Sequence, residues 1–360
     1  MPTVTADALR RIGYDFFAAV GCRPADARIV TDHLVQSNLF GHDSHGVVHM
    51  ERYGRAVWEE QRVDPRAVPD IVREYPCTAV VDANGGFGQV GATFATNLLI
   101  QKAQQYGVAS VSLRDTSHIG RLSAYPLMVA QAGMIGLIFV NAGRMGFQVA
   151  PFGGIDGRLG TNPLAFASPR RADTPLFVDM STSTVADGKI YIAANQGKPV
   201  PEGWFVDAEG NPSTNPHDYF GEPRGAVLPL GGPLGHKGFA LSLMMEICGG
   251  GMSGQGMSQG DMRFSSNGVL ITAYDIAQFT DPEAFYAEVE ALVSHVKSSR
   301  TAPGVDEILV PGEPEFRTER ERGQTGIPID DTTWEKLCAA ARELGLEPDT
   351  WELASRDAAD

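Results

Sequence analysis

Apolar and polar positions follow a helical rhythm near the start of the chain. Apolar side chains recur there at three- and four-residue spacing, as at Leu9, Ile12, Phe16, Phe17 and Val20, which is the spacing of an amphipathic helix. The pattern predicts helices over residues 1–20, 25–39 and 47–60. A proline-bearing segment, 63–69, follows and is the first candidate domain boundary.

The rhythm changes at Cys77, where short apolar runs bounded by glycine and polar turns predict strands. The expected strands are 78–82, 108–113, 134–140, 164–167, 176–178 and 269–274. The expected helices in this part are 92–106, 238–248, 282–298 and 332–344. Strands that alternate with helices indicate the α/β class, and a length of 360 residues indicates at least two domains.

Composition narrows the choice of partners and compartment. Lysine and arginine number 29 against 44 acidic residues, so the formal charge is −15 and no nucleic-acid partner is expected. No apolar run is long enough for a membrane span, and charges interrupt the first helix, so neither a membrane protein nor a signal peptide is predicted. The cysteines number 4, far apart in sequence and without a Cys-x-x-Cys pair. This usage favours a reducing, cytoplasmic location.

Two glycine motifs match the G-x-G-x-x-G pattern of dinucleotide sites. The one at 249–254 follows a helix and is rejected, because the fingerprint requires a strand before it. The one at 86–91 lies between a predicted strand and a predicted helix, with Asp115 at the end of the next strand. It is either a dinucleotide fingerprint or a glycine-rich turn, and the short strands and turns downstream argue against a doubly wound fold.

Histidines mark two candidate sites. His42, His45 and His49 are spaced so that they would share one helix face, which fits either a metal site or a polar catalytic cluster. No fourth metal ligand is evident, so we expect no metal. His118 follows a predicted strand, where site residues concentrate, and is either structural or catalytic on local grounds.

Two further segments could hold an anion or a ribose. The hydroxyls of 179–184 either anchor such a group or cap a helix. The loop 230–238, which includes Lys237, leads into a helix whose first amides would suit an anion, or it is a simple junction.

Taken together and in order, these pieces resemble the malate/L-lactate dehydrogenase family over residues 5–345. The resemblance is carried by residues 41–46, 117–121, 160–163, 179–184, 186–189 and 236–238. Segments 311–315 and 326–328 look most like the hydroxycarboxylate dehydrogenase branch.

The resemblance implies an α/β fold of the α+β kind that is not a Rossmann fold: a largely antiparallel cofactor-binding sheet with helices, plus a helical domain built from both chain termini. Segment 86–91 is then only a tight turn. The implied domains are 1–72 with 305–360 (helical), 73–140 with 225–304 (cofactor-binding) and 141–224 (smaller, strand-rich). A homodimer is also implied.

The family's activity, carried over by position, is hydride transfer between NAD or NADP and a small 2-hydroxy or 2-oxo acid, with NAD slightly favoured. His118 would be the acid/base, with Ser44 and His45 beside the substrate and the nicotinamide. The implied cofactor-binding residues are His45, Thr161, Asp179, Met180, Ser181, Gly312, Glu313 and Pro314.

One departure affects the substrate. The family often has arginine where this chain has His49, and a histidine binds a carboxylate more weakly and in a pH-dependent way. The carboxylate is then left to Arg52 or Arg121, while Tyr53 either lines the pocket or packs in the core. The alternatives to a 2-hydroxy acid dehydrogenase are a reductase of cyclic imino acids (piperideine or pyrroline carboxylates), a metal-binding protein that uses the three histidines, and an inactive binder.

Overall fold

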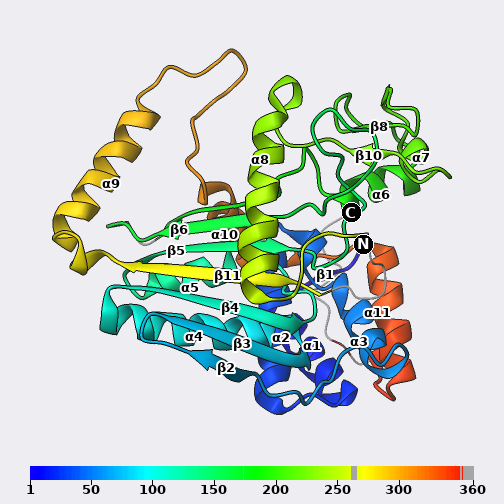
Figure 1. Ribbon diagram of the computed structural model, residues 1–360. Helices are drawn as coiled ribbons and strands as arrows, with labels where there is room; N and C mark the ends of the chain where they lie inside the picture. Colours follow the sequence, from blue (N-terminus) through cyan, green and yellow to red (C-terminus); the bar gives the residue numbers. More distant parts are fainter. Residues whose placement is uncertain (173, 261–265, 349–350, 352–360) are drawn as a thin grey trace.

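The computed structural model describes residues 1–172, 174–260, 266–348 and 351. Figure 1 shows a central sheet with the N-terminal helices and the C-terminal helix α11 gathered at one end of it. The α/β class is thereby confirmed. Residues 349–350 and 352–360 of the predicted helical domain lie outside the described residues. Among the described helices, none is both long and apolar enough to cross a bilayer.

The central sheet has seven strands in the order β2-β3-β4-β11-β5-β6-β7. Their bounds are β2 Asp70–Glu74, β3 Thr78–Gly86, β4 Val108–Thr116, β5 Met134–Asn141, β6 Leu164–Ser168, β7 Leu176–Met180 and β11 Gly268–Asp275. Strands β3 and β4 are parallel, and the other neighbouring pairs are antiparallel. The parallel pair places the ends of β3 and β4 at the same edge, where the predicted His118 loop begins.

Residues from both chain ends form one helical layer. Its helices are α1 (Ala6–Val20), α2 (Pro24–Leu39), α3 (His49–Trp58) and α11 (Asp331–Glu343), and strand β1 (Thr3–Val4) pairs with β12 (Ile327–Pro328). The apolar stripe of α1 is buried against these neighbours. Thr5 caps the first turn of α1, and Gly21, at φ 106°, ends the helix in the left-handed conformation that favours glycine. Residues from both chain ends thus share one hydrophobic cluster, while the division into domains stays a prediction.

The remaining elements surround the sheet. Helices α4 (Gly88–Tyr106) and α5 (Ala124–Gln131) pack on it, and α9 (Pro282–Lys297) and α10 (Glu313–Thr325) follow later in the chain. A small sheet, β10-β8-β9, lies in the middle region with α6 and α7. Their bounds are α6 Asp187–Asn195, β8 Phe205–Val206, β9 Pro212–Ser213, α7 Pro216–Tyr219 and β10 Ala226–Val227.

Some sequence expectations were wrong in detail. Helix α8 (His236–Met245) does not end at the glycines that follow, because the chain continues as a π-helical turn, Glu246–Gly251. Helix α11 begins at Asp331, one residue before the expected start at 332, because Asp330 is its N-cap and accepts from the Thr333 amide. Helices α5, α6 and α10 were missed. Helix α10 has no buried residue, so it lacks the apolar stripe that a periodicity search detects.

The π-helical turn holds a buried acid. The Glu246 carboxylate accepts hydrogen bonds from the Nδ2 atoms of Asn141 (2.9 Å) and Asn162 (2.8 Å), and from the amide (2.8 Å) and Oγ (2.6 Å) of Ser258. Removal of the acid would break these four hydrogen bonds, three of them from donors that keep a further acceptor, and would leave the Ser258 amide without an acceptor. We expect Glu246→Ala to lower the free energy of unfolding by about 3 kcal/mol. Urea unfolding followed by circular dichroism would measure the loss, and a change within about 0.5 kcal/mol would contradict this role.

Candidate active site

The loop after β4 carries His118 and is fixed from two sides. The Gly88 amide, at the start of α4, donates to Ser117 Oγ at 2.9 Å, and the Ile119 amide donates to Asn267 Oδ1 at 3.1 Å. A Cβ on Gly88 would lie 2.4 Å from the His118 carbonyl oxygen. The glycines at 86–91 therefore form a tight turn that lets the backbone of this loop approach closely, as the family resemblance implied.

Helix α3 brings three of the predicted residues to His118. Tyr53 Oη lies 2.6 Å from His118 Nδ1, and the rings of His49 and Tyr53 stack in near-parallel planes at 5.2 Å. The His118 ring centroid lies 5.3 Å from that of His49 and 5.8 Å from that of His45. Arg52 lies on the exposed side of α3 and lines one cavity together with Tyr53 and His118. Sequence positions more than sixty residues apart thus converge on one imidazole.

The environment keeps these imidazoles neutral. Burial, followed by the nearby His49, His45 and Arg52, holds the pKa of His118 well below its ordinary value. Burial is also the main cause that lowers the pKa of His45. A neutral imidazole at ordinary pH can accept a proton, which is the property that a general base needs.

The histidines also make stability depend on pH. Burial, then Arg52 and His45, lower the pKa of His49 to about 3, whereas an unfolded chain titrates a histidine near about 6.5. Between these values the unfolded state binds the proton and the folded state does not. Stability from this source is therefore complete above pH ~6.5 and is lost as the pH falls toward 3.

We expect wild type to lose more unfolding free energy than His49→Gln when the pH is lowered from about 7 to about 4.5. Glutamine cannot titrate, so the variant lacks this part of the pH slope. Denaturant unfolding at both pH values measures the difference. Equal losses in the two proteins would show that His49 is not protonated more readily on unfolding.

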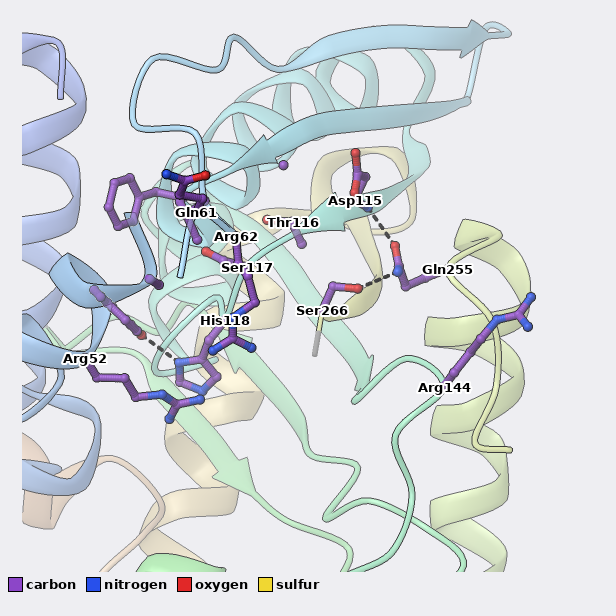
Figure 2. A pocket seen from close by; sticks show the side chains of 15 residues that line it. Arg52, Gln61, Arg62, Asp115, Thr116, Ser117, His118, Arg144, Gln255 and Ser266 are labelled. Carbon is purple, nitrogen blue, oxygen red and sulfur yellow. Dashed lines mark hydrogen bonds between the residues drawn. The ribbon is translucent and has the colours of Figure 1, made fainter. Parts of the chain in front are cut away.

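Two cavities meet at His118. The larger, of about 460 Å³, is also lined by Arg52, Tyr53 and Arg144, and Figure 2 shows Arg144 across the pocket from Arg52 and His118. The smaller, of about 170 Å³, is lined by His45 and His118 together with Thr161, Asn162 and Pro163, among others. His118 thus has room for a ligand on two sides.

Arg121 is not brought to either cavity. Its guanidinium is buried, donates to Ser123 Oγ at 2.6 Å and lies 4.5 Å over the Phe40 ring. It lines a separate cavity of about 650 Å³. Of the two arginines predicted to bind a carboxylate, only Arg52 has a place in the pocket of His118.

The predicted cofactor segments lie side by side. The Phe177 amide on β7, just before Asp179–Ser181, donates to the Pro311 carbonyl at 3.4 Å, and a Cβ on Gly312 would touch the Phe177 ring at 2.9 Å. The Asp179 carboxylate accepts from the Ser123 amide at 2.7 Å and is close enough to favour the charged form of His45. Glu313 is bound by Lys297 at 2.7 Å. Asp179 links this edge of the sheet to the histidines.

The three histidines of the N-terminal motif do not converge on one point. His42 faces Glu315, with Nε2 and Oε1 3.4 Å apart, while His45 contacts Ser44 Oγ through Nδ1 at 3.0 Å. Within the described part of the chain, no group of three histidine, cysteine or acidic side chains is arranged to hold a metal ion. The geometry therefore gives no support to the metal-binding alternative.

Sequence reasoning missed several residues around His118. Gln89 on α4 donates to Tyr53 Oη at 3.1 Å. Asn267 accepts from the Ile119 amide through Oδ1 and donates to the Asn141 carbonyl of β5 through Nδ2, so it ties the loop to the sheet. Asn162, at φ 37°, stands within the motif 160–163 but was not selected. A left-handed asparagine is a local signal for a special site, but it becomes visible only once backbone angles are known.

Comparison with known proteins decides the family. Residues 4–338 match the model of the malate/L-lactate dehydrogenase family. The chain belongs to this family. Among curated members, hydroxycarboxylate dehydrogenase B of Escherichia coli O157:H7 is 38% identical over 342 residues, 93% of this chain and 92% of that protein. Malate dehydrogenase of Pyrococcus horikoshii is 37% identical over 336 residues, 91% of each chain. The sequence-based assignment to the malate/L-lactate dehydrogenase family is thus confirmed.

Solved structures of family members share the fold. Sulfolactate dehydrogenase from Methanocaldococcus jannaschii superposes with a TM-score of 0.86 at 32% identity, covering 97% of this chain and 99% of that one. A Δ1-piperideine-2-carboxylate reductase from Pseudomonas syringae gives a TM-score of 0.82 at 29% identity, covering 95% and 100%. Most of these malate/L-lactate dehydrogenase relatives are named dehydrogenases of 2-hydroxy acids, so this member is an oxidoreductase.

Proposed function

We propose that the chain is an NAD(P)-dependent dehydrogenase of small 2-hydroxy acids with His118 as its general acid/base. The observation that carries the proposal is that His118 lines two cavities at once. A substrate in the larger cavity and a nicotinamide ring in the smaller would both border the imidazole. His118 would then stand where a hydroxyl proton must be removed as hydride leaves the α-carbon.

The residues of the smaller cavity fit a nicotinamide group. The recess combines apolar walls, including Leu122, Val140 and Pro163, with Asn162, whose buried Oδ1 has no hydrogen-bond partner. An amide donor on a ligand would satisfy such an atom. His45 and Thr161 line this recess, and the adjoining segments 179–181 and 312–314 would hold the rest of the cofactor. When bound, the cofactor supplies hydride acceptance or donation.

In the oxidation direction, Nε2 of neutral His118 accepts the hydroxyl proton while the α-carbon loses hydride and becomes the carbonyl carbon. In the reduction direction the same nitrogen returns the proton to the oxygen. Ser44 and His45 would orient the reacting oxygen. Arg52 is suited to bind the carboxylate, because it is the predicted arginine that lines the pocket of His118.

A panel of 2-oxo acids with NADH and with NADPH, followed by the absorbance of the reduced nicotinamide, tests the proposal. Turnover of at least one acid, with a preference between the two cofactors, is expected. No turnover across the panel, together with no binding of either cofactor by fluorescence, would reject the proposal and leave an inactive binder.

Reduction of a cyclic imino acid is a second candidate, favoured by the likeness to the Pseudomonas syringae reductase. An imine nitrogen would replace the carbonyl oxygen as the atom that receives the proton. Piperideine- and pyrroline-carboxylate belong in the same panel. Higher kcat/KM for these imines than for every 2-oxo acid would favour this candidate over the first.

We propose a homodimer as the assembly. Leu243 and Met244 of α8 and Ile247 of the π-helical turn that continues it are exposed. Figure 1 shows α8 in front of the central sheet. An apolar helix face of this kind can be buried by a two-fold copy of itself. Light scattering should give the mass of a dimer, and Ile247→Glu should shift the protein toward a monomer.

A further inference from the structure

We propose that Gln89, Tyr53 and His118 form a reversible hydrogen-bond relay that sets which ring nitrogen of His118 carries its proton. The inference rests on the proposed function of His118 as acid/base. In this relay Tyr53 and Gln89 are positioning residues, because they act on the reaction only through the imidazole.

The three groups form one buried line. Gln89 Nε2 donates to Tyr53 Oη at 3.1 Å, and Tyr53 Oη lies 2.6 Å from His118 Nδ1. Gln89 is fully buried and Tyr53 is 5% exposed, so the hydrogen bond between these two side chains is shielded from water. The stacked His49 ring holds the Tyr53 ring in plane and keeps its hydroxyl directed at the imidazole.

One atom in this line has no partner. Gln89 Oε1 is buried and makes no hydrogen bond. A half-turn of the carboxamide would exchange the positions of its two polar atoms, bringing Oε1 to Tyr53 Oη and moving Nε2 to the unpartnered position. The carboxamide can therefore present either a donor or an acceptor to the tyrosine.

The two amide orientations correspond to two forms of the imidazole. With Nε2 of Gln89 toward Tyr53, the phenol accepts from Gln89 and donates to His118 Nδ1, so the imidazole proton lies on Nε2. With Oε1 toward Tyr53, the phenol donates to Gln89 and accepts from Nδ1–H. His118 Nε2 then has a free lone pair, or it carries the second proton of the imidazolium.

The oxidation reaction needs the second arrangement. Nε2 must begin without a proton and end with the proton from the substrate hydroxyl, while Nδ1 keeps its own proton throughout. The first arrangement converts to the second when Nε2 releases its proton to solvent in the larger cavity and Nδ1 takes one up from solvent, and the hydrogen bonds of Tyr53 and Gln89 then reverse direction. During hydride transfer these bonds keep the second arrangement, so neither Tyr53 nor Gln89 has a net gain or loss of protons. Tyr53 stays a neutral phenol because burial raises its pKa above the ordinary value. Gln89 Oε1 is thus the acceptor that the Tyr53 hydroxyl needs when His118 carries protons on both ring nitrogens.

Two variants separate this role from simple packing. Gln89→Leu keeps the volume but cannot accept from Tyr53, so the phenol donates permanently to Nδ1. We expect the ¹⁵N signals of His118, assigned by comparison with His118→Asn, to shift toward the form protonated on Nε2. We expect kcat for oxidation to fall roughly 10- to 100-fold with KM nearly unchanged.

Tyr53→Phe removes the link itself and should cause a loss of at least similar size. In the Tyr53→Phe background, Gln89→Leu should then have no further effect, because its influence passes through the phenol. Thr96→Val is the matched control: Thr96 is a buried polar residue on the same helix, and its hydroxyl donates to the Ala92 carbonyl at 2.7 Å. This control should leave kcat and the His118 signals unchanged.

The outcomes are separable. Unchanged ¹⁵N signals in Gln89→Leu, or losses that multiply in the double variant, overturn the relay. If Gln89→Leu does not fold, wild-type signals and kcat in Tyr53→Phe alone overturn it. If His118→Ala keeps normal turnover, the proposed function itself fails. If His118→Ala is inactive while Tyr53→Phe is fully active, only the relay fails.

Discussion

His118→Ala is expected to lower kcat by roughly 10²- to 10⁴-fold, the range that a positioned acid/base contributes. The methyl group of alanine cannot take the hydroxyl proton, and among the described residues His118 is the histidine that lines both cavities, whereas His45 lines only the smaller one. Steady-state kinetics with the best acid from the substrate panel would measure the effect.

Cofactor binding is the control for this variant. His118 lines the smaller cavity, but the unpartnered oxygen that would accept from the cofactor belongs to Asn162. The Kd of His118→Ala for the cofactor should therefore stay within a few fold of the wild-type value. Near-normal kcat would remove His118 from the acid/base role. Loss of cofactor binding would instead assign the imidazole a role in binding.

Gly88→Ala is expected to have the second-largest effect, a loss of about 10²-fold in kcat/KM. The added methyl would lie 2.4 Å from the His118 carbonyl oxygen and 2.6 Å from that of Ser117. Both contacts are with backbone, so the loop that carries the imidazole must move. A displacement of about 1 Å at a catalytic group can cost a hundredfold in rate.

Gly323→Ala is the matched control for this prediction. Gly323 lies within α10, and a methyl there meets nothing within 4 Å. Helix propensity alone then applies, and alanine should stabilise the fold by about 0.5–1 kcal/mol with unchanged activity. Full activity in Gly88→Ala would mean that the loop can shift without disturbing His118.

Periodicity in the sequence was sufficient for most of the long elements. The stripe of Leu9, Ile12 and Phe16 predicted α1, and the apolar run at 134–140 predicted β5. Periodicity failed at α10, which buries no residue, and at the glycines after α8, which continue the helix as a π-helical turn. At the turn after α8, packing against β5 and β11, and not local preference, fixes the conformation.

The candidate site was only partly accessible from sequence. Resemblance to the family selected His118 and His45, and Tyr53 was a candidate for the pocket or the core; the structure brings the three together. It also selected Arg121, whose side chain turns to Ser123 and Phe40. Spacing along a chain does not reveal side-chain direction. Gln89 stands among the glycines of segment 86–91, and nothing in the sequence around it indicates a role at His118. Its contact with Tyr53 depends on how two distant segments pack.

The far end of the chain bears on the chemistry at His118. Helix α11 packs on α3, and Glu343 binds Arg55 at 3.0 Å, one turn or less beyond the pocket residues Arg52 and Tyr53. A chain shortened before α11 would leave α3 without its outer support. Tyr53 would then lose its register with the imidazole although every residue of the pocket was still encoded. We therefore expect substitutions in α11 to change turnover as well as stability.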